Sequence, residues 1–128
     1  EVGQNPTSFE HEPFERTVAK CQRYYQRYPF ISETTSGLVA HQYSATNCYG
    51  GFRFKRVMRV EPTFSLTADA NDFTVYNEGA GRTVSAVASD GMHVDGCSLN
   101  FTTSSATAGN ATAVNGNADG GFQFDSEL

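Results

Sequence analysis

The sequence has no tryptophan, only three cysteines and no long run of apolar residues, and each shortage excludes a class of protein. A helix that crosses a membrane needs about 18 to 20 mostly apolar residues in a row, so no membrane insertion is expected. The three cysteines, Cys21, Cys48 and Cys97, are odd in number and form no C-x-x-C pair. Such a set is neither a disulfide framework nor a zinc signature, and reduced thiols suit folding in a reducing cytoplasm. We expect Cys21 and Cys97 to pack in the core.

Motifs of catalysis and of metal binding are also missing. There is no nucleophile elbow, no H-E-x-x-H and no phosphate-binding or dinucleotide-binding loop. His11, His41 and His93 have no ligand spacing, and the stretch 69–72 lacks the glycine and the distant glutamate of an EF-hand loop. One open alternative is His41, which could hold a metal if a trimer axis repeated it three times. The sequence therefore predicts no enzymatic activity, no catalytic residues, no cofactor and no metal.

The charges are unevenly distributed along the chain. The net charge is −5, but residues 16–59 hold eight bases and one acid, whereas residues 60–128 hold nine acids and one base. A basic block of this density could contact nucleic acid, yet the whole chain is acidic, so no nucleic-acid partner is expected. We expect the bases, in particular Arg53, Lys55, Arg56 and Arg59, to pair with carboxylates of the acidic part, within the chain or in a neighbouring subunit.

Alternating apolar and polar residues are frequent in the sequence, and the stretch 51–66 is the clearest example. Phe52 and Phe54 alternate with bases, the pattern slips by one residue at 56–57, and Pro62 interrupts it. A one-residue slip is typical of a β-bulge, and proline cannot donate a ladder hydrogen bond. We therefore expect a long bent strand, followed after Pro62 by a second strand that reaches Leu66.

Shorter strands are predicted around this stretch. Alternation and turn residues place them at 38–44, 73–76, 83–88, 92–94, 99–101, 111–114 and 121–128. A hairpin turn is predicted at Asp90-Gly91 and a second turn at Asp95-Gly96. About eight short strands at this spacing indicate an all-β fold, a jelly-roll-like β-sandwich. The residues 13–128 form a single domain in this prediction.

One amphipathic helix is predicted at 13–28, after a polar connecting arm at 1–12. Pro13 suits a first helical position, and Pro29 ends the helix. Apolar residues recur at spacings of four, three, four and three, namely Phe14, Val18, Cys21, Tyr25 and Tyr28, while basic residues occupy the opposite face. We expect the apolar face to be buried against the sheet or against a neighbouring subunit.

Several blocks of the sequence resemble one family. They are Phe9-Glu10-His11, Cys21-Gln22-Arg23-Tyr24-Tyr25, Phe52-Arg53-Phe54-Lys55, Arg59-Val60-Glu61-Pro62-Thr63 and the final Phe124-Asp125-Ser126-Glu127-Leu128. With these blocks the chain resembles the C-terminal receptor-binding module of bacteriophage tail fibres and related virion adhesins, from about 9 to 128. It departs from that pattern in its Asn/Gly/Ala-rich stretch at 103–120. The chain lacks an initial methionine, which indicates a fragment or a processed product.

The resemblance implies a homotrimer of β-sandwich subunits on the virion surface, made in the host cytoplasm. Such a module binds a host cell-surface glycan or other receptor, ends its polypeptide, and joins other fibre or tail proteins through its N-terminal side. The first alternative is a structural virion module, such as a fibre cap or a decoration protein. A further alternative is a polysaccharide-cleaving tip, which would need paired carboxylates in a cleft.

Candidate receptor-binding residues are polar or aromatic side chains in expected turns. Aromatic faces and amide or guanidinium donors suit the rings and hydroxyls of sugars. The candidates are Tyr49, Asn71, Asp72, Tyr76, Asn77 and Arg82.

Overall fold

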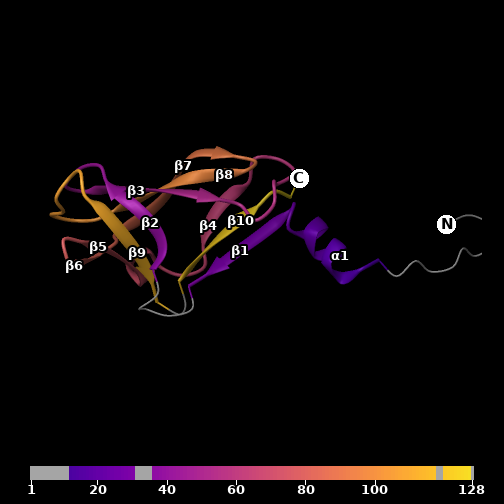
Figure 1. Ribbon diagram of the computed structural model, residues 1–128, viewed down its shortest axis with the longest axis horizontal. Helices are drawn as coiled ribbons and strands as arrows, with labels where there is room; N and C mark the ends of the chain where they lie inside the picture. Colours follow the sequence, from indigo (N-terminus) through magenta and orange to yellow (C-terminus); the bar gives the residue numbers. More distant parts are fainter. Residues whose placement is uncertain (1–11, 31–35, 118–119, 128) are drawn as a thin grey trace, which may run out of the picture.

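The computed structural model of the chain describes residues 12–30, 36–117 and 120–127. Within them, one short α-helix precedes ten strands, which form a seven-stranded and a three-stranded sheet (Figure 1). The prediction of an all-β sandwich with one N-terminal helix is confirmed, with ten strands in place of about eight. The predicted arm at 1–12 lies outside the described residues except for Glu12. No helix in the described ranges is long and apolar enough to span a membrane.

The larger sheet has the strand order β6-β5-β9-β2-β3-β8-β7, and all its neighbours are antiparallel. Its strands are β2 (Ser36–Gln42), β3 (Asn47–Arg53), β5 (Phe73–Asn77), β6 (Ala80–Thr83), β7 (Ala86–His93), β8 (Gly96–Thr102) and β9 (Ala111–Gly116). The sheet curls, so that β5 and β6 lie across from β3 and β8 in Figure 1. Buried residues alternate with more exposed ones along β8 and β9, as expected for strands with one face toward a core.

The smaller sheet has the order β1-β10-β4 and supplies the other side of the core. Its strands are β1 (Tyr25–Pro29), β4 (Thr63–Leu66) and β10 (Gly121–Asp125). In the central strand, Phe122 and Phe124 are almost completely buried. Phe122 stacks on Phe73 of the larger sheet with ring centroids 5.3 Å apart, and Phe124 stacks on Phe52 at 5.4 Å. Aromatic rings from both sheets therefore form the centre of the sandwich.

The long bent strand expected between 51 and Pro62 does not form, so that prediction is wrong. β3 ends at Arg53 in the larger sheet, and β4 begins at Thr63 in the smaller one. The backbone between them is held by other partners, because Phe54 N and Met58 N donate to the carbonyls of Asp95 and Val94. The Met58 side chain is buried in the core. The predicted break at Pro62 and the second strand after it are both present.

The helix begins where it was predicted but is half as long as expected. α1 spans Phe14–Cys21, and the chain then turns at 22–24 and becomes β1. β1 pairs with β10 from Tyr25↔Asp125 to Pro29↔Gly121, so long-range strand pairing overrides the helical periodicity of this segment. The expected burial of the apolar face is met only at Tyr28, which packs on Phe52 with ring centroids 4.5 Å apart. Among the described residues α1 has no buried side chain, and Phe14 is 81% exposed. Burial against a neighbouring subunit stays a prediction.

Of the two turns predicted near residue 90, the first is wrong and the second is displaced by one residue. Asp90-Gly91 is not a hairpin turn but lies inside β7, where the register shifts between Asp90 and His93. Gly91 has φ +57°, which glycine adopts at little cost and which suits the irregular pairing there. The hairpin closes at Val94-Asp95, beside the predicted second turn, with His93 paired to Gly96. The strand predicted at 83–88 is interrupted at 84–85, because Val84 turns its side chain into the core.

The three cysteines differ in their surroundings. Cys97 packs in the core as predicted, and Cys48 is completely buried beside Thr112, whose Oγ1 lies 3.0 Å from its Sγ. Burial raises the pKa of Cys48 and raises the pKa of Cys97 to about 11. Cys21, in contrast, is exposed, so its predicted core position is wrong.

We predict that neither buried thiol reacts in the folded protein. In a Cys21→Ser variant at pH 8, an aromatic disulfide reagent should modify no thiol in native buffer and two per chain in denaturant. The reagent cannot reach a buried thiol. A raised pKa also slows the reaction, because it lowers the fraction of thiolate, which is the reactive form. Fast release of the chromophore without denaturant would contradict the prediction.

Candidate functional site

The outer face of the β5–β9 pair carries a row of polar and aromatic side chains. The register pairs Thr74 with Asn115 and Tyr76 with Ala113. Val75 and Val114, which alternate with these residues, are fully buried in the core. Successive strand residues point to opposite sides of a sheet, so Thr74, Tyr76 and Asn115 face outward together.

A polar hollow of about 270 Å³ lies on this face. It opens where β5 begins and β9 ends, next to the short 3₁₀ turn η1 (Ala70–Asp72). Its lining consists of Asn71, Asp72, Thr74, Tyr76, Asn115, Gly116 and Asn117. The hollow therefore combines three amides, one carboxylate, one hydroxyl and one phenol ring over a small area.

The Asp72 carboxylate is held in place from two sides. Its Oδ2 accepts a hydrogen bond from the backbone N–H of Asp69 at 3.1 Å, and its Oδ1 accepts one from Asn117 Nδ2 at 2.5 Å. The backbone adds a further link, because Asn117 N donates to the Asp72 carbonyl at 2.9 Å. Asn117 Oδ1 in turn accepts from Gly120 N. Each carboxylate oxygen has a second lone pair, so Asp72 can still accept a hydrogen bond from a ligand.

Tyr76 supplies an aromatic surface at one side of the hollow. The side chain is 42% exposed and comes from the middle of the β5–β6 ladder, opposite Gly81. A Cβ placed on Gly81 would lie 3.3 Å from a carbon of the Tyr76 ring. The missing side chain at 81 thus leaves room for the ring to lie against the neighbouring strand.

Three of the six predicted site residues meet at this hollow, namely Asn71, Asp72 and Tyr76. Two others point to the opposite side of β5 and β6. Asn77 is fully buried, not in an exposed turn, and its amide exchanges hydrogen bonds with the Thr107 backbone. Arg82 pairs with the inward-facing Val75, and its Nη1 donates to the Ser104 carbonyl. Side chains at neighbouring strand positions point to opposite faces of a sheet, so neither Asn77 nor Arg82 reaches the hollow. Their hydrogen bonds give both of them structural roles.

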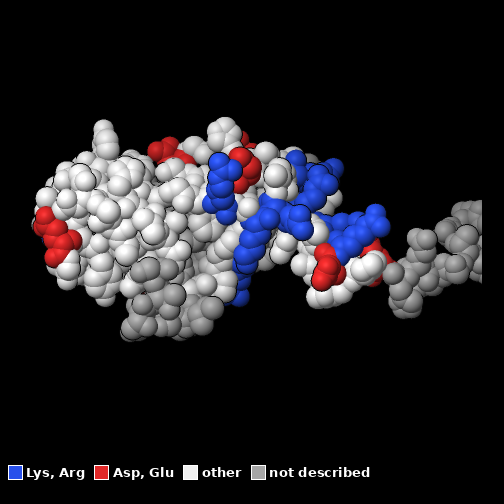
Figure 2. All heavy atoms as spheres, in the orientation of Figure 1, with Lys and Arg blue, Asp and Glu red and all other residues white. Residues whose placement is uncertain are grey.

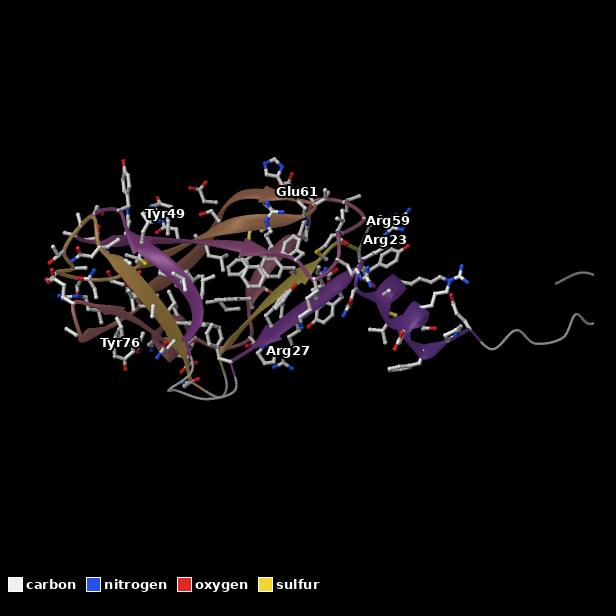
Figure 3. The ribbon with its side chains drawn as sticks, viewed as in Figure 1. Arg23, Arg27, Tyr49, Arg59, Glu61 and Tyr76 are labelled. Atoms are coloured by element: carbon white, nitrogen blue, oxygen red, sulfur yellow. The ribbon has the colours of Figure 1, made fainter. Side chains whose placement is uncertain are left out.

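Tyr49 belongs to a separate group of side chains. It lies in β3, not in a turn, and its ring stacks on His41 at 6.2 Å and contacts Tyr43 edge-on at 5.8 Å. Its hydroxyl accepts a hydrogen bond from Asn100 Nδ2. Figure 3 shows Tyr49 and Tyr76 on opposite sides of the curled sheet. Tyr49 is thus no part of the polar hollow.

Sequence reasoning missed Thr74, Asn115 and Asn117. The asparagines lie in a stretch rich in Thr, Ala, Asn and Gly, which was interpreted as a loop around a small strand. β9 extends to Gly116, two residues further than predicted. The two-residue spacing of 115 and 117 shows that both can share one face, but only the pairing of β9 with β5 brings them to Asp72.

Two of the basic residues, Lys55 and Arg59, lie over aromatic rings. Lys55 Nζ lies 4.9 Å from the ring centroid of Tyr28, and the Arg59 guanidinium lies 5.6 Å from that of Tyr24. The ion pairs within the described ranges join Glu12 to Arg16 and Lys20. The expected pairing of Arg53, Lys55, Arg56 and Arg59 with carboxylates is therefore not found among the described residues of one chain. Figure 2 shows Lys and Arg gathered on the half of the molecule that carries α1.

The hollow has the chemistry of a binding site. Asp72 is the one carboxylate among the described residues that line it, whereas glycoside hydrolysis generally uses two. In the described part of the chain, no group of three or more His, Cys, Asp or Glu side chains could hold a metal ion.

Comparisons with protein-family models, with curated proteins and with solved structures found no match to this chain.

Proposed function

We propose that this chain is a host-adhesion domain of a bacteriophage tail fibre or another virion surface protein, and that it binds a cell-surface glycan as a homotrimer. The observation that supports glycan binding most directly is the hollow in which the Tyr76 ring, the oriented Asp72 carboxylate and the amides of Asn71, Asn115 and Asn117 lie together. The assignment to a virion rests on the sequence resemblance. The N-terminal side joins the rest of the fibre in this proposal.

Each group in the hollow matches a part of a sugar. Carboxylate oxygens accept from hydroxyl groups, and amides can both donate to and accept from them. The C–H face of a pyranose ring packs on an aromatic ring such as Tyr76, which is apolar on its faces and polar at its hydroxyl. A shallow site with these few groups is expected to bind one sugar unit, with a dissociation constant around millimolar.

The charge of the hollow selects among sugars. Its described lining has one acid and no base. An anionic sugar would place its carboxylate near Asp72 without a cation to offset the repulsion. We therefore propose a neutral hexose as the preferred ligand.

Two substitutions in the hollow test the proposed function. Tyr76→Ala removes the aromatic face, and Asp72→Asn removes the charge that strengthens its hydrogen bonds, which are worth about 1.5–3 kcal/mol when one partner is ionised. Each should weaken binding of the fluorescent domain to host cells, and to a neutral hexose in solution, by about tenfold or more. The melting temperature of Tyr76→Ala should change little, because this side chain is 42% exposed. That of Asp72→Asn should fall by a few degrees, because an amide nitrogen cannot accept the hydrogen bond that one carboxylate oxygen accepts from Asp69 N or Asn117 Nδ2.

Tyr43→Ala is the matched control, since Tyr43 is 70% exposed in the connection between β2 and β3 and lies outside the hollow. It should bind like the wild type. If Tyr76→Ala and Asp72→Asn also bind like the wild type, the hollow is not the receptor site. If the wild type binds no host cell, the alternative of a structural fibre cap or decoration protein is preferred. A fall in the viscosity of a host polysaccharide on adding the domain would favour a cleaving tip.

A further inference from the structure

We infer that the apolar stripe of α1 is the surface through which copies of this chain associate, with their helices parallel and side by side. The inference rests on the self-association contained in the proposed function and names the contact that produces it. The apolar face of the helix is uncovered, because Phe14 is 81% exposed and none of the residues in α1 is buried. Figure 1 shows α1 projecting from the end of the domain, away from both sheets.

The spacing of the stripe is that of a helical seam between chains. Phe14, Val18 and Cys21 follow one another at intervals of four and three residues. Apolar residues at alternating intervals of three and four occupy the two core positions of a heptad, where each side chain inserts between residues of the facing helix. A hollow of about 300 Å³ opens beside Phe14 and Val18, also lined by Arg56, so this side of α1 offers a recess as well as a projecting ring.

The charges on α1 favour another copy of the same helix as the partner. The positions that flank the stripe are Glu15, Thr17 and Gln22, and none is basic. The bases Arg16 and Lys20 occupy outer positions of the heptad, where both pair with Glu12, at 3.1 and 2.6 Å. Parallel copies would therefore bring apolar side chains together while keeping the cations of the two helices at outer positions, away from the seam.

The helix also needs such a contact for its own stability. Helices shorter than about 12 residues are marginal in water unless their apolar face is packed. α1 has eight residues and no side-chain hydrogen bond at its N-cap, Pro13. Just beyond its C-terminal end, the chain is anchored by the hydrogen bond from Arg59 N to the Arg23 carbonyl. Association along the stripe supplies the missing packing.

The position of α1 is compatible with glycan binding. β5 and β9, whose outer face carries the polar hollow, lie in the half of the domain away from α1 (Figure 1). Copies joined by their helices keep these hollows free.

Cysteine cross-linking tests the seam directly. Cys21 is exposed, whereas Cys48 and Cys97 are buried. In a parallel seam, Cys21 lies opposite Cys21 of the neighbouring copy, so diamide should convert most of the chain at about 10 μM to a disulfide-linked dimer on a non-reducing gel. The control moves the thiol to an outer position of the helix, by Cys21→Ser together with Arg16→Cys, and should form less than about a tenth as much dimer.

Light scattering gives an independent measurement. The full chain should have three times the 13.9 kDa mass of one copy. Val18→Asp should reduce the mass to that of one copy without changing the β-sheet circular dichroism. Arg16→Asp, at an outer position that does not line the hollow beside the stripe, should stay associated. A monomeric wild type would overturn the inference. So would an associated protein in which Cys21 does not cross-link and Val18→Asp has no effect, which would leave glycan binding and a trimer formed elsewhere intact.

Discussion

Replacing Phe124 with alanine should lower the free energy of unfolding by about 3–5 kcal/mol, the usual cost of truncating a fully buried phenylalanine. Phe124 is 0% exposed, and its ring centroid lies 4.6 Å from that of Phe54 and 5.5 Å from that of Phe64. It also stacks on Phe52, so it joins the smaller sheet to the larger one. A single domain is usually stable by only about 5–15 kcal/mol, and the change should therefore remove a large part of its stability.

Urea unfolding followed by circular dichroism measures this effect. The control is Val39→Ala, because Val39 is 76% exposed on the outside of β2 and its truncation should change the free energy by no more than about 0.5 kcal/mol. Similar midpoints for the two variants would mean that the sheets are not joined through Phe124. If Phe124→Ala does not fold, Phe124→Leu should fold with a smaller loss.

The second large effect concerns avidity. One hollow binding one hexose around millimolar contributes roughly −4 kcal/mol. When three hollows face a dense layer of glycans, the later contacts become intramolecular, and overall binding strengthens by about 10² to 10⁴ without any new contact. We expect the wild-type protein to bind whole cells that much more tightly than Val18→Asp does, although both bind the free hexose equally.

Flow cytometry on host cells and calorimetry with the free sugar provide the two measurements. The associated variant Arg16→Asp is the control and should bind cells like the wild type. Equal cell binding by Val18→Asp and the wild type would show that multivalency through α1 does not drive adhesion. Loss of free-hexose binding in Val18→Asp would instead indicate that the substitution disturbs the hollow, which lies in the half of the domain away from α1.

Part of the candidate site could be predicted from the residues alone. Asn71, Asp72 and Tyr76 were chosen because polar and aromatic side chains near turns suit sugars, and they line one hollow. The same criterion also selected Asn77 and Arg82, which sit one residue out of phase with the outward positions of β5 and β6. Since a shift of one residue reverses the face of a strand, such choices depend on the register.

The sequence by itself determined the class of the fold and the positions of most strands. Alternation at 97–101 and 122–124 marks strands with one buried face, and Pro13 marks the start of the helix. These patterns are local, because the side chains of strands and helices repeat every two and 3.6 residues whatever else the chain does.

The tertiary structure decided where the local patterns end and which of them meet. The helical spacing continues to Tyr28, but pairing with β10 makes 25–29 a strand. The alternation of 51–66 is divided between two sheets, because the backbone at 54 and 58 bonds to the turn between β7 and β8. The polar hollow exists only because β9 pairs with β5, about forty residues away along the chain. Strand pairing joins residues distant in sequence, and its energy depends on the partner, which a single segment does not specify.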